Sequence, residues 1–370
     1  MSVSLDNVTK MAGGASHIGG VSLTLERGTI NVLLGPTLSG KTSLMRLLAG
    51  LDVPTSGKIL VEGKDVTGKA VRERSVAMVY QQFINYPLLS VYENIASPLR
   101  VRGVSRAEIE RRVADAARLL RLEPYLKRTP LELSGGQQQR TAIARALVKG
   151  ADLVLLDEPL ANLDYKLREE LRAELPKLFE GSGAIFVYAT TEPSEALLLG
   201  GNTATLHEGR ITQFGPTVDI YRTPSDRRTA AVFSDPPMNF LRLEMANGAA
   251  SMSGKGLPVS GSLSGLPDGT YDIGFRPHHV KLTQDAKTPI ALSGKIAVSE
   301  ITGSESFVHV DGGDGTGDRR WIVLTPGVHE QVPGTPVTIY LDPERFFVFA
   351  TSGKLVHAPK TVAPKTAGGA

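Results

Sequence analysis

The stretch TINVLLGPTLSGKTSLMRLLAG, residues 29–50, decides the fold. Its apolar beginning predicts a buried strand, and Leu44, Leu47 and Leu48 are spaced as on one face of a helix. Between the two lies the pattern G-x-x-x-x-G-K-[ST], in which backbone N–H groups and a helix N-terminus surround phosphates beside a lysine. A plain glycine turn is the alternative. The expected phosphate-binding residues are Gly35, Pro36, Thr37, Leu38, Ser39, Gly40, Lys41, Thr42 and Ser43.

A second apolar run, DLVLLDEP at 152–159, ends in two acids and supports this interpretation. Asp157 is placed to hold Mg²⁺ together with Thr42, and Glu158 to polarise a water molecule. Alone, the two acids would also fit an ordinary acidic helix start. Together with the phosphate loop, they predict a phosphoryl-transfer site.

A third segment, LSGGQQQRTAIARAL at 133–147, has a serine and two glycines before an amphipathic stretch. It predicts a second helix start suited to an anion. In this order the motifs resemble the nucleotide-binding subunits of ABC transporters. The resemblance implies ATP and Mg²⁺ as cofactors, a Q-loop glutamine that also reaches the metal, and a D-loop at Ala161–Asp164. The resemblance adds five residues to the expected nucleotide-binding set: Gln81, Ser134, Gly135, Gly136 and Gln137.

In that family, two subunits pair head to tail, and each LSGGQ signature caps the γ-phosphate held by the other. The predicted fold is therefore an α/β P-loop NTPase, with a mostly parallel core sheet and antiparallel β and helical subdomains. We place this ATPase at 1–235, with its helical subdomain at about 84–150. Short alternating runs with turn signals predict an all-β, OB-like barrel at 236–357. A Pro/Ala/Gly/Lys-rich tail at 358–370 is expected to be disordered.

Further stretches resemble the carbohydrate-importer ATPases, which carry an OB-like regulatory domain. They are VYENIASPL at 91–99, RTPSDRRTAAVFSDPPMNFL at 222–241, FRPHHV at 275–280 and EITGSESFVHV at 300–310. The resemblance implies two transmembrane permease subunits, a solute-binding protein reached indirectly, and a sugar, polyol or glycerol-like solute. It also implies a peripheral place on the cytoplasmic face of the inner membrane. Apolar residues 83–89 would receive a permease helix, unless they pack onto their own subdomain.

Composition is consistent with this class. The 370 residues carry a net charge of only +3 and include no cysteine, which excludes disulfides and thiolate metal sites. No apolar run approaches the length that spans a bilayer, and no signal peptide is expected at the N-terminus. The predicted barrel is slightly acidic, which argues against nucleic acid as a partner.

Two departures from the family pattern set the functional hypothesis. Thr191 stands where a switch histidine would contact the γ-phosphate, and Ala12 stands where an aromatic ring would stack on adenine. His17 is interpreted as a loop histidine and His207 as a strand residue, while Leu38 replaces a glycine in the phosphate loop.

We therefore expect a transport ATPase that forms one half of an asymmetric pair with a second ABC ATPase. A homodimer that relies on Glu158 is the rival. An ATP-holding regulatory subunit with little hydrolysis is the functional alternative. A soluble ABC protein of translation or repair would carry a second cassette, which this chain lacks.

Overall fold

The computed structural model describes residues 2–161, 163–252, 255–312 and 320–359. The chain forms two compact units that divide between Thr217 and Val218. The sequence placed the division at 235, whereas Ala230 packs with Phe347 and Phe349 of the second unit. Residues 360–370 of the predicted tail lie outside the described residues, as does Asn162 of the D-loop. Among the described residues, no helix combines the length and apolar character needed to cross a membrane.

A six-stranded sheet forms the centre of the first unit, in the order β10-β9-β3-β8-β7-β6. All neighbouring pairs are parallel except β9 and β10, which form an antiparallel hairpin. Every residue of β7 and β8 is buried, as expected for parallel strands covered on both faces. The mostly parallel sheet is therefore confirmed. The strands are β3 (Ile30–Leu34), β6 (Val76–Val79), β7 (Leu153–Asp157), β8 (Ile185–Thr190), β9 (Asn202–His207) and β10 (Arg210–Pro216).

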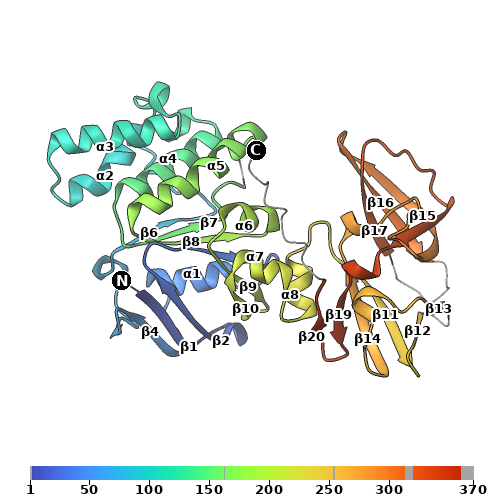
Figure 1. Cartoon of the computed structure of the whole chain (residues 1–370). Coiled ribbons are helices and arrows are strands. Elements are labelled where there is room, and N and C mark those ends of the chain that lie inside the picture. Colours follow the sequence, from blue (N-terminus) through green and yellow to red (C-terminus); the bar gives the residue numbers. More distant parts are fainter. Residues whose placement is uncertain (1, 162, 253–254, 313–319, 360–370) are drawn as a thin grey trace, which may run out of the picture. The chain divides into compact units, whose positions relative to one another are not determined.

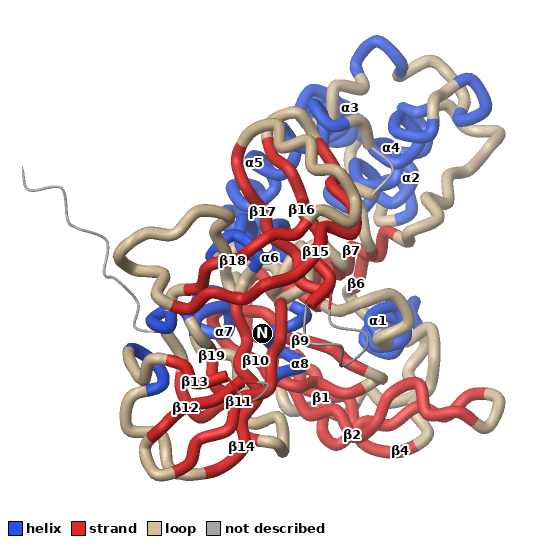
Figure 2. Tube along the Cα trace, turned by 90° about the vertical axis from the view of Figure 1, so that its right-hand side faces the viewer, coloured by secondary structure: helices blue, strands red, loops and turns tan. Residues whose placement is uncertain are grey.

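An antiparallel sheet, β2-β1-β4-β5, lies on the same side of the core sheet as helix α1 (Figures 1 and 2). Leu44, Leu47 and Leu48 of α1 are buried in one apolar cluster with residues of both sheets. The helical spacing of the leucines thus fixes which face of α1 enters the core. The elements are β1 (Ser2–Ala12), β2 (Ala15–Glu26), β4 (Ser56–Val61), β5 (Lys64–Asp65) and α1 (Lys41–Ala49).

Helices cover the other side of the core sheet, where α2, α3 and α4 form a separate group (Figure 1). Serines begin all three helices, because each serine hydroxyl accepts a hydrogen bond from a backbone N–H of the first turn. The helices are α2 (Val91–Val101), α3 (Arg106–Leu119), α4 (Gly135–Val148), α5 (Tyr165–Ser182) and α6 (Pro193–Leu199). Three 3₁₀ turns occupy Val71–Glu73, Glu123–Tyr125 and Pro130–Glu132.

The second unit consists of two antiparallel sheets, β13-β12-β11-β14-β19-β20 and β17-β16-β15-β18, with one shared apolar core. The side chain of Asn239 in β11 joins them, because it donates to the carbonyl of Ile322 and accepts from its N–H, both at 2.8 Å. This amide therefore links β11 of one sheet to β17 of the other. The all-β prediction is therefore confirmed.

The strands of this unit are β11 (Asn239–Ala246), β12 (Ala249–Met252), β13 (Lys255–Leu257), β14 (Gly269–Phe275), β15 (Ile290–Ile301), β16 (Glu305–Gly312), β17 (Arg320–Pro326), β18 (Pro336–Leu341), β19 (Phe347–Ala350) and β20 (Leu355–His357). Helix α7 (Thr217–Arg222) begins at the division and α8 (Arg227–Val232) follows it. Three 3₁₀ turns occupy Gly261–Leu263, Pro277–His279 and Pro343–Arg345.

Candidate nucleotide site

The phosphate loop runs from the end of β3 to the start of α1 and is tightly enclosed at its two glycines. A Cβ on Gly35 would lie 2.5 Å from the carbonyl oxygen of Leu206, and one on Gly40 would lie 3.0 Å from that of His17. Gly40 also has φ 101°, which favours glycine. Leu38 has φ 66° but is 95% exposed, so its side chain points out of the loop. The loop is therefore shaped by backbone approach rather than by side chains.

Lys41 is the first residue of α1 and is only 5% exposed. Its Nζ donates to the carbonyls of Gly35 at 2.8 Å and Pro36 at 3.1 Å, and lies 3.6 Å from Oε1 of Glu158. Burial lowers the pKa of Lys41, while the nearby carboxylate of Glu158 opposes that shift. The loop thus encloses a cation beside its own carbonyl oxygens.

The start of α1 fits an anion. Gly40 offers no side chain to cap the helix, and the first turn contains no acidic residue. Its backbone N–H groups therefore have no side-chain acceptor, although a helix N-terminus favours negative charge. The buried hydroxyl of Ser39 also has no hydrogen-bond partner among the described residues. These donors, together with Lys41, suit a phosphate chain.

The acids at the end of β7 meet the phosphate loop. Thr42 Oγ1 donates to Asp157 Oδ2 at 2.8 Å, and Gln81 Nε2 donates to Glu158 Oε2 at 3.1 Å. Burial raises the pKa of Asp157, against the hydrogen bond from Thr42. No cluster of three or more His, Cys, Asp or Glu suited to a metal occurs in the part of the chain that the structure describes. Mg²⁺ fits this oxygen set, because it needs few protein carboxylates when phosphates and water complete its shell.

Glu158 itself sits in a left-handed conformation, φ 46°, which is uncommon for a residue with a side chain. Its N–H donates to the carbonyl of Ala189 in β8, and its carbonyl accepts from the N–H of Ala161 at 3.3 Å. These two bonds aim the carboxylate at Lys41 and Gln81. The backbone strain is thus held by neighbouring segments.

The LSGGQ segment forms a complete capping box at the start of α4. Ser134 Oγ accepts from the N–H of Gln137 at 3.4 Å, and Gln137 Oε1 accepts from the N–H of Ser134 at 3.0 Å. Ser134 and Gly135 are exposed. A Cβ on Gly135 would come no closer than 3.8 Å to Phe83, so packing within the chain does not explain this glycine. The sequence analysis missed the box, although its S-x-x-Q pattern is readable.

The structure separates this segment from the phosphate loop. In both views, α1 and α4 lie on opposite sides of the core sheet (Figures 1 and 2). Among the described residues, no hydrogen bond joins the Gly35–Ser43 loop to Ser134–Gln137. One group of predicted residues is therefore assembled around Lys41, and the signature stands apart from it.

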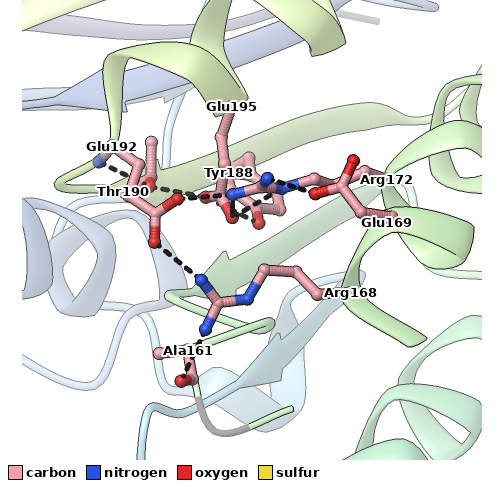
Figure 3. A network of polar contacts seen from close by, with 8 residues as sticks. All are labelled: Ala161, Arg168, Glu169, Arg172, Tyr188, Thr190, Glu192 and Glu195. Carbon is pink, nitrogen blue, oxygen red and sulfur yellow. Dashed lines mark hydrogen bonds and ion pairs between the residues drawn. The ribbon is translucent and has the colours of Figure 1, made fainter. Parts of the chain in front are cut away.

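Thr191 follows β8 directly and is exposed. Its sequence neighbours Thr190 and Glu192 belong to a polar network that sequence reasoning missed (Figure 3). Buried Glu195 accepts hydrogen bonds from Tyr188 and Thr190 through Oε2, at 3.0 and 2.6 Å. Arg172 lies 3.1 Å from Oε1 of the same residue. These contacts join separate elements, so no local pattern in the sequence marks them.

The remaining predicted positions lie as follows. Ala12 ends β1 and is exposed. His17 is also exposed, but it lies in β2, so its interpretation as a loop histidine is wrong. His207 ends β9, with Nδ1 3.8 Å from the carboxylate of Glu208, so its interpretation as a strand residue is confirmed.

The loop 83–89 presents apolar side chains to solvent. Ile84, Tyr86 and Leu88 are exposed, Leu88 by 90%. Helix α2 fixes the loop backbone, because Nδ2 of its residue Asn94 donates to the carbonyls of Tyr86 and Leu89, both at 3.0 Å. The Tyr86 ring also lies under the guanidinium of Arg145, 5.0 Å from Cζ to the ring centroid. Ile84 and Leu88 nevertheless leave apolar surface exposed.

Fold and site together define an ABC-type ATPase. The sequence model described as "ABC transporter" matches residues 18–161, and that described as "TOBE domain" matches residues 273–349. Among solved structures, the ATP-binding cassette MJ0796 in a dimeric post-hydrolysis state with ADP and Pi is 31% identical, with a TM-score of 0.53. It covers 58% of this chain, which covers 98% of it. A second dimeric structure of that bacterial ABC transporter cassette is 30% identical, with a TM-score of 0.54 over the same shares.

Curated relatives match both units. The sn-glycerol-3-phosphate import ATP-binding protein UgpC of Ruegeria pomeroyi is 38% identical, over 88% of this chain and 90% of the relative. The protein of the same name from Vibrio vulnificus is 36% identical, over 93% of this chain and 91% of the relative. The one from Salmonella typhi is 36% identical, over 91% of this chain and 94% of the relative. The chain belongs to the family of ABC importer ATP-binding subunits with a C-terminal OB-like domain, which couple ATP hydrolysis to the uptake of a solute.

Proposed function

We propose that this chain powers the uptake of a glycerol phosphate or a related polyol or sugar from a head-to-tail ATPase dimer. The solute class rests on relatives that are named for sn-glycerol-3-phosphate import. One observation supports the dimer. The chain has two helix starts suited to a phosphate, those of α1 and α4, and they lie on opposite sides of its core sheet. The first is the start of α1, at the buried Lys41. The second is the start of α4, where Ser134 and Gly135 are exposed and packing within the chain does not explain Gly135. The similar cassette MJ0796 is dimeric in both solved structures.

In this proposal, the phosphate loop from Gly35 to Ser43 binds the triphosphate of ATP through its backbone N–H groups and Lys41. Thr42, Gln81 and Asp157 hold Mg²⁺. When bound, Mg²⁺ neutralises charge on the phosphates. Glu158 orients and polarises the attacking water, since its carboxylate is fixed beside Lys41 and Gln81. The signature helix start of the other chain would close this site, and Ser134–Gln137 of this chain would close the site of the other.

The altered positions favour an asymmetric pair. An exposed Thr191 offers a hydroxyl where a histidine would reach further and could carry charge. Ala12 offers no ring to stack on adenine. We infer a site that binds ATP weakly and turns over slowly, while its signature completes a stronger site in a second ABC ATPase. A homodimer, or a regulatory subunit with little hydrolysis, would have the same fold.

Two transmembrane permease subunits would dock on the exposed Ile84, Tyr86 and Leu88 surface, in the manner of a helix entering an apolar groove. The solute-binding protein acts on those permeases from the other side and does not touch this chain. The protein would then work peripherally on the cytoplasmic face of the inner membrane. Nucleic acid is not an expected partner.

The experiment is ATP hydrolysis and solute uptake by the importer in vesicles, with Glu158→Gln as the test variant. For the assembled importer we expect uptake of glycerol 3-phosphate. In the chain prepared without a second ABC ATPase, where only its own site can turn over, the variant should lose hydrolysis by about 100-fold or more, with ATP binding retained. Glycerol and an unphosphorylated sugar are the competing solutes. Full hydrolysis by the variant would refute the role of Glu158, and uptake of only an unphosphorylated solute would refute the solute class.

A further inference from the structure

One arginine links the two segments that flank the proposed catalytic groups. Arg168 lies in α5, and its two terminal nitrogens point to different segments (Figure 3). Nη1 lies 3.1 Å from Oε1 of Glu192, the residue after Thr191. Nη2 donates to the carbonyl oxygen of Ala161 at 3.1 Å, three residues after Glu158. A planar guanidinium can satisfy both at once, because its N–H groups form a rigid fork.

The Ala161 end of this link supports Glu158. The N–H of Ala161 donates to the carbonyl of Glu158, which closes a turn over residues 158–161. Glu158 holds a strained φ of 46° within that turn. A strained backbone persists only where its surroundings over-determine it, and Arg168 fixes the far side of the turn.

The Glu192 end supports Thr191. The N–H of Glu192 donates to Thr190 Oγ1 at 3.0 Å, so the peptide that follows Thr191 is held by the side chain that precedes it. Arg172 also binds Glu192 and contacts Glu195, which anchors this end to the buried Tyr188 and Thr190 hydroxyls. Thr191 itself stays exposed on a fixed backbone.

We propose that Arg168 is a positioning residue that keeps Glu158 and Thr191 in register during ATP hydrolysis. It touches neither nucleotide nor water in this scheme, and it acts through the carbonyl of Ala161 and the carboxylate of Glu192. The inference rests on the proposed roles of Glu158 and Thr191. It adds that a displacement of the Glu158–Ala161 turn would displace the segment around Thr191, and the reverse.

The first test is amide hydrogen exchange on the full-length chain, which does not depend on turnover. Arg168→Gln should speed exchange by about tenfold in both Glu158–Ala161 and Thr190–Glu195, since hydrogen bonds to charged groups contribute more than neutral ones. Arg121→Gln is the matched control, because it removes the same charge from an ion pair with Glu170 of the same helix. The control should leave both segments unchanged.

The second test is steady-state hydrolysis by the full-length chain prepared without a second ABC ATPase, so that the rate reports only its own site. Arg168→Gln should lower kcat by about tenfold or more with the apparent ATP affinity unchanged, because small misplacement of catalytic groups is costly. Arg168→Lys should recover part of kcat, since an ammonium reaches one of the two acceptors. Glu192→Gln should lower kcat as well, and by less in the Arg168→Gln background than in the wild type, because in that background only its contact with Arg172 is still lost.

The inference is overturned if Arg168→Gln changes exchange in only one segment, or in neither. It is equally overturned if kcat stays at the level of the Arg121→Gln control, or if the Arg168 and Glu192 effects multiply independently. These outcomes are separable from the proposed function. If Glu158→Gln hydrolyses ATP normally, the role of Glu158 fails, while the exchange result still reports whether Arg168 couples the two segments.

Discussion

The hydroxyl of Thr42 lies 2.8 Å from Oδ2 of Asp157, so a residue of the first turn of α1 meets the end of β7 across 115 positions of sequence. This pair is the proposed Mg²⁺ site. Thr42→Val removes the hydroxyl and leaves a buried carboxylate without its donor. We expect the variant to lose the Mg²⁺-dependent part of its ATP affinity, by about 1–3 kcal/mol.

Calorimetric ATP binding with Mg²⁺ and with a chelator measures that difference. Thr42→Ser keeps the hydroxyl and is the control, which should behave like the wild type. If Thr42→Val kept the full effect of Mg²⁺, the metal would not depend on this pair.

Thr191 offers a second prediction. Thr191→His restores an imidazole at the end of β8, on a backbone that Thr190 and Glu192 already fix. We expect faster hydrolysis, by about tenfold, because contacts made to the transition state contribute a few kcal/mol. The measurement is kcat at saturating ATP, with Thr191→Ala as the comparison. Equal rates for the histidine and alanine variants would argue against a switch role for this position.

Ala12 predicts weak adenine binding. Ala12 and Ala15 pair across the turn between β1 and β2, so each is a control for the other. Ala12→Tyr should tighten ATP binding by about 1–3 kcal/mol through base stacking, whereas Ala15→Tyr should not. Fluorescent-nucleotide titration compares the two. If both tyrosines, or neither, tightened binding, the base would not lie against Ala12.

The barrel should lose stability in acid through His279. Burial lowers the pKa of His279 to about 3, with further contributions from His278, Arg345 and Arg276, and its Nδ1 has no partner among the described residues. In the unfolded chain this histidine binds a proton as the pH falls through about 6.5, whereas in the folded barrel it stays neutral at that pH. Stability from this group is therefore complete above pH 6.5 and declines as the pH falls toward 3.

Trp321 is the single tryptophan of the chain and is buried in the barrel, so its fluorescence follows unfolding of this unit. Between pH 7 and pH 4.5, wild type should lose more stability than His279→Gln, by at most about 1.4 kcal/mol per pH unit. Parallel losses in the two proteins would assign the acid sensitivity to other groups.

The sequence predicted the phosphate loop, the β7 strand and the parallel sheet because each is a local pattern. Phosphate binding needs a strand, a loop and a helix in direct succession, so Lys41 could be placed before any contact was known. The all-β barrel followed from alternating runs and turns. The exposed apolar loop at 83–89 was also predicted from its composition.

The network beneath Thr191 could not be predicted in this way. Arg168 and Arg172 look like ordinary charged residues of an amphipathic helix, where most such pairs are solvated. Their partners Glu192 and Glu195 lie 20–24 positions away on another element. The packing of Ala230 against Phe347 could not be predicted for the same reason, because the two residues lie far apart along the chain.

The most direct measurement is disulfide formation between differently tagged copies, Leu38→Cys in one and Ser134→Cys in the other, prepared without a second ABC ATPase so that the copies can pair only with each other. The chain has no native cysteine, both positions are exposed, and the two cysteines reside on separate molecules. With ATP, Mg²⁺ and Glu158→Gln in both copies, we predict a covalent dimer carrying both tags that fails to form without nucleotide. If no mixed link forms, while a single copy bearing both cysteines closes a link within itself, the signature caps its own phosphate loop and the head-to-tail dimer is wrong.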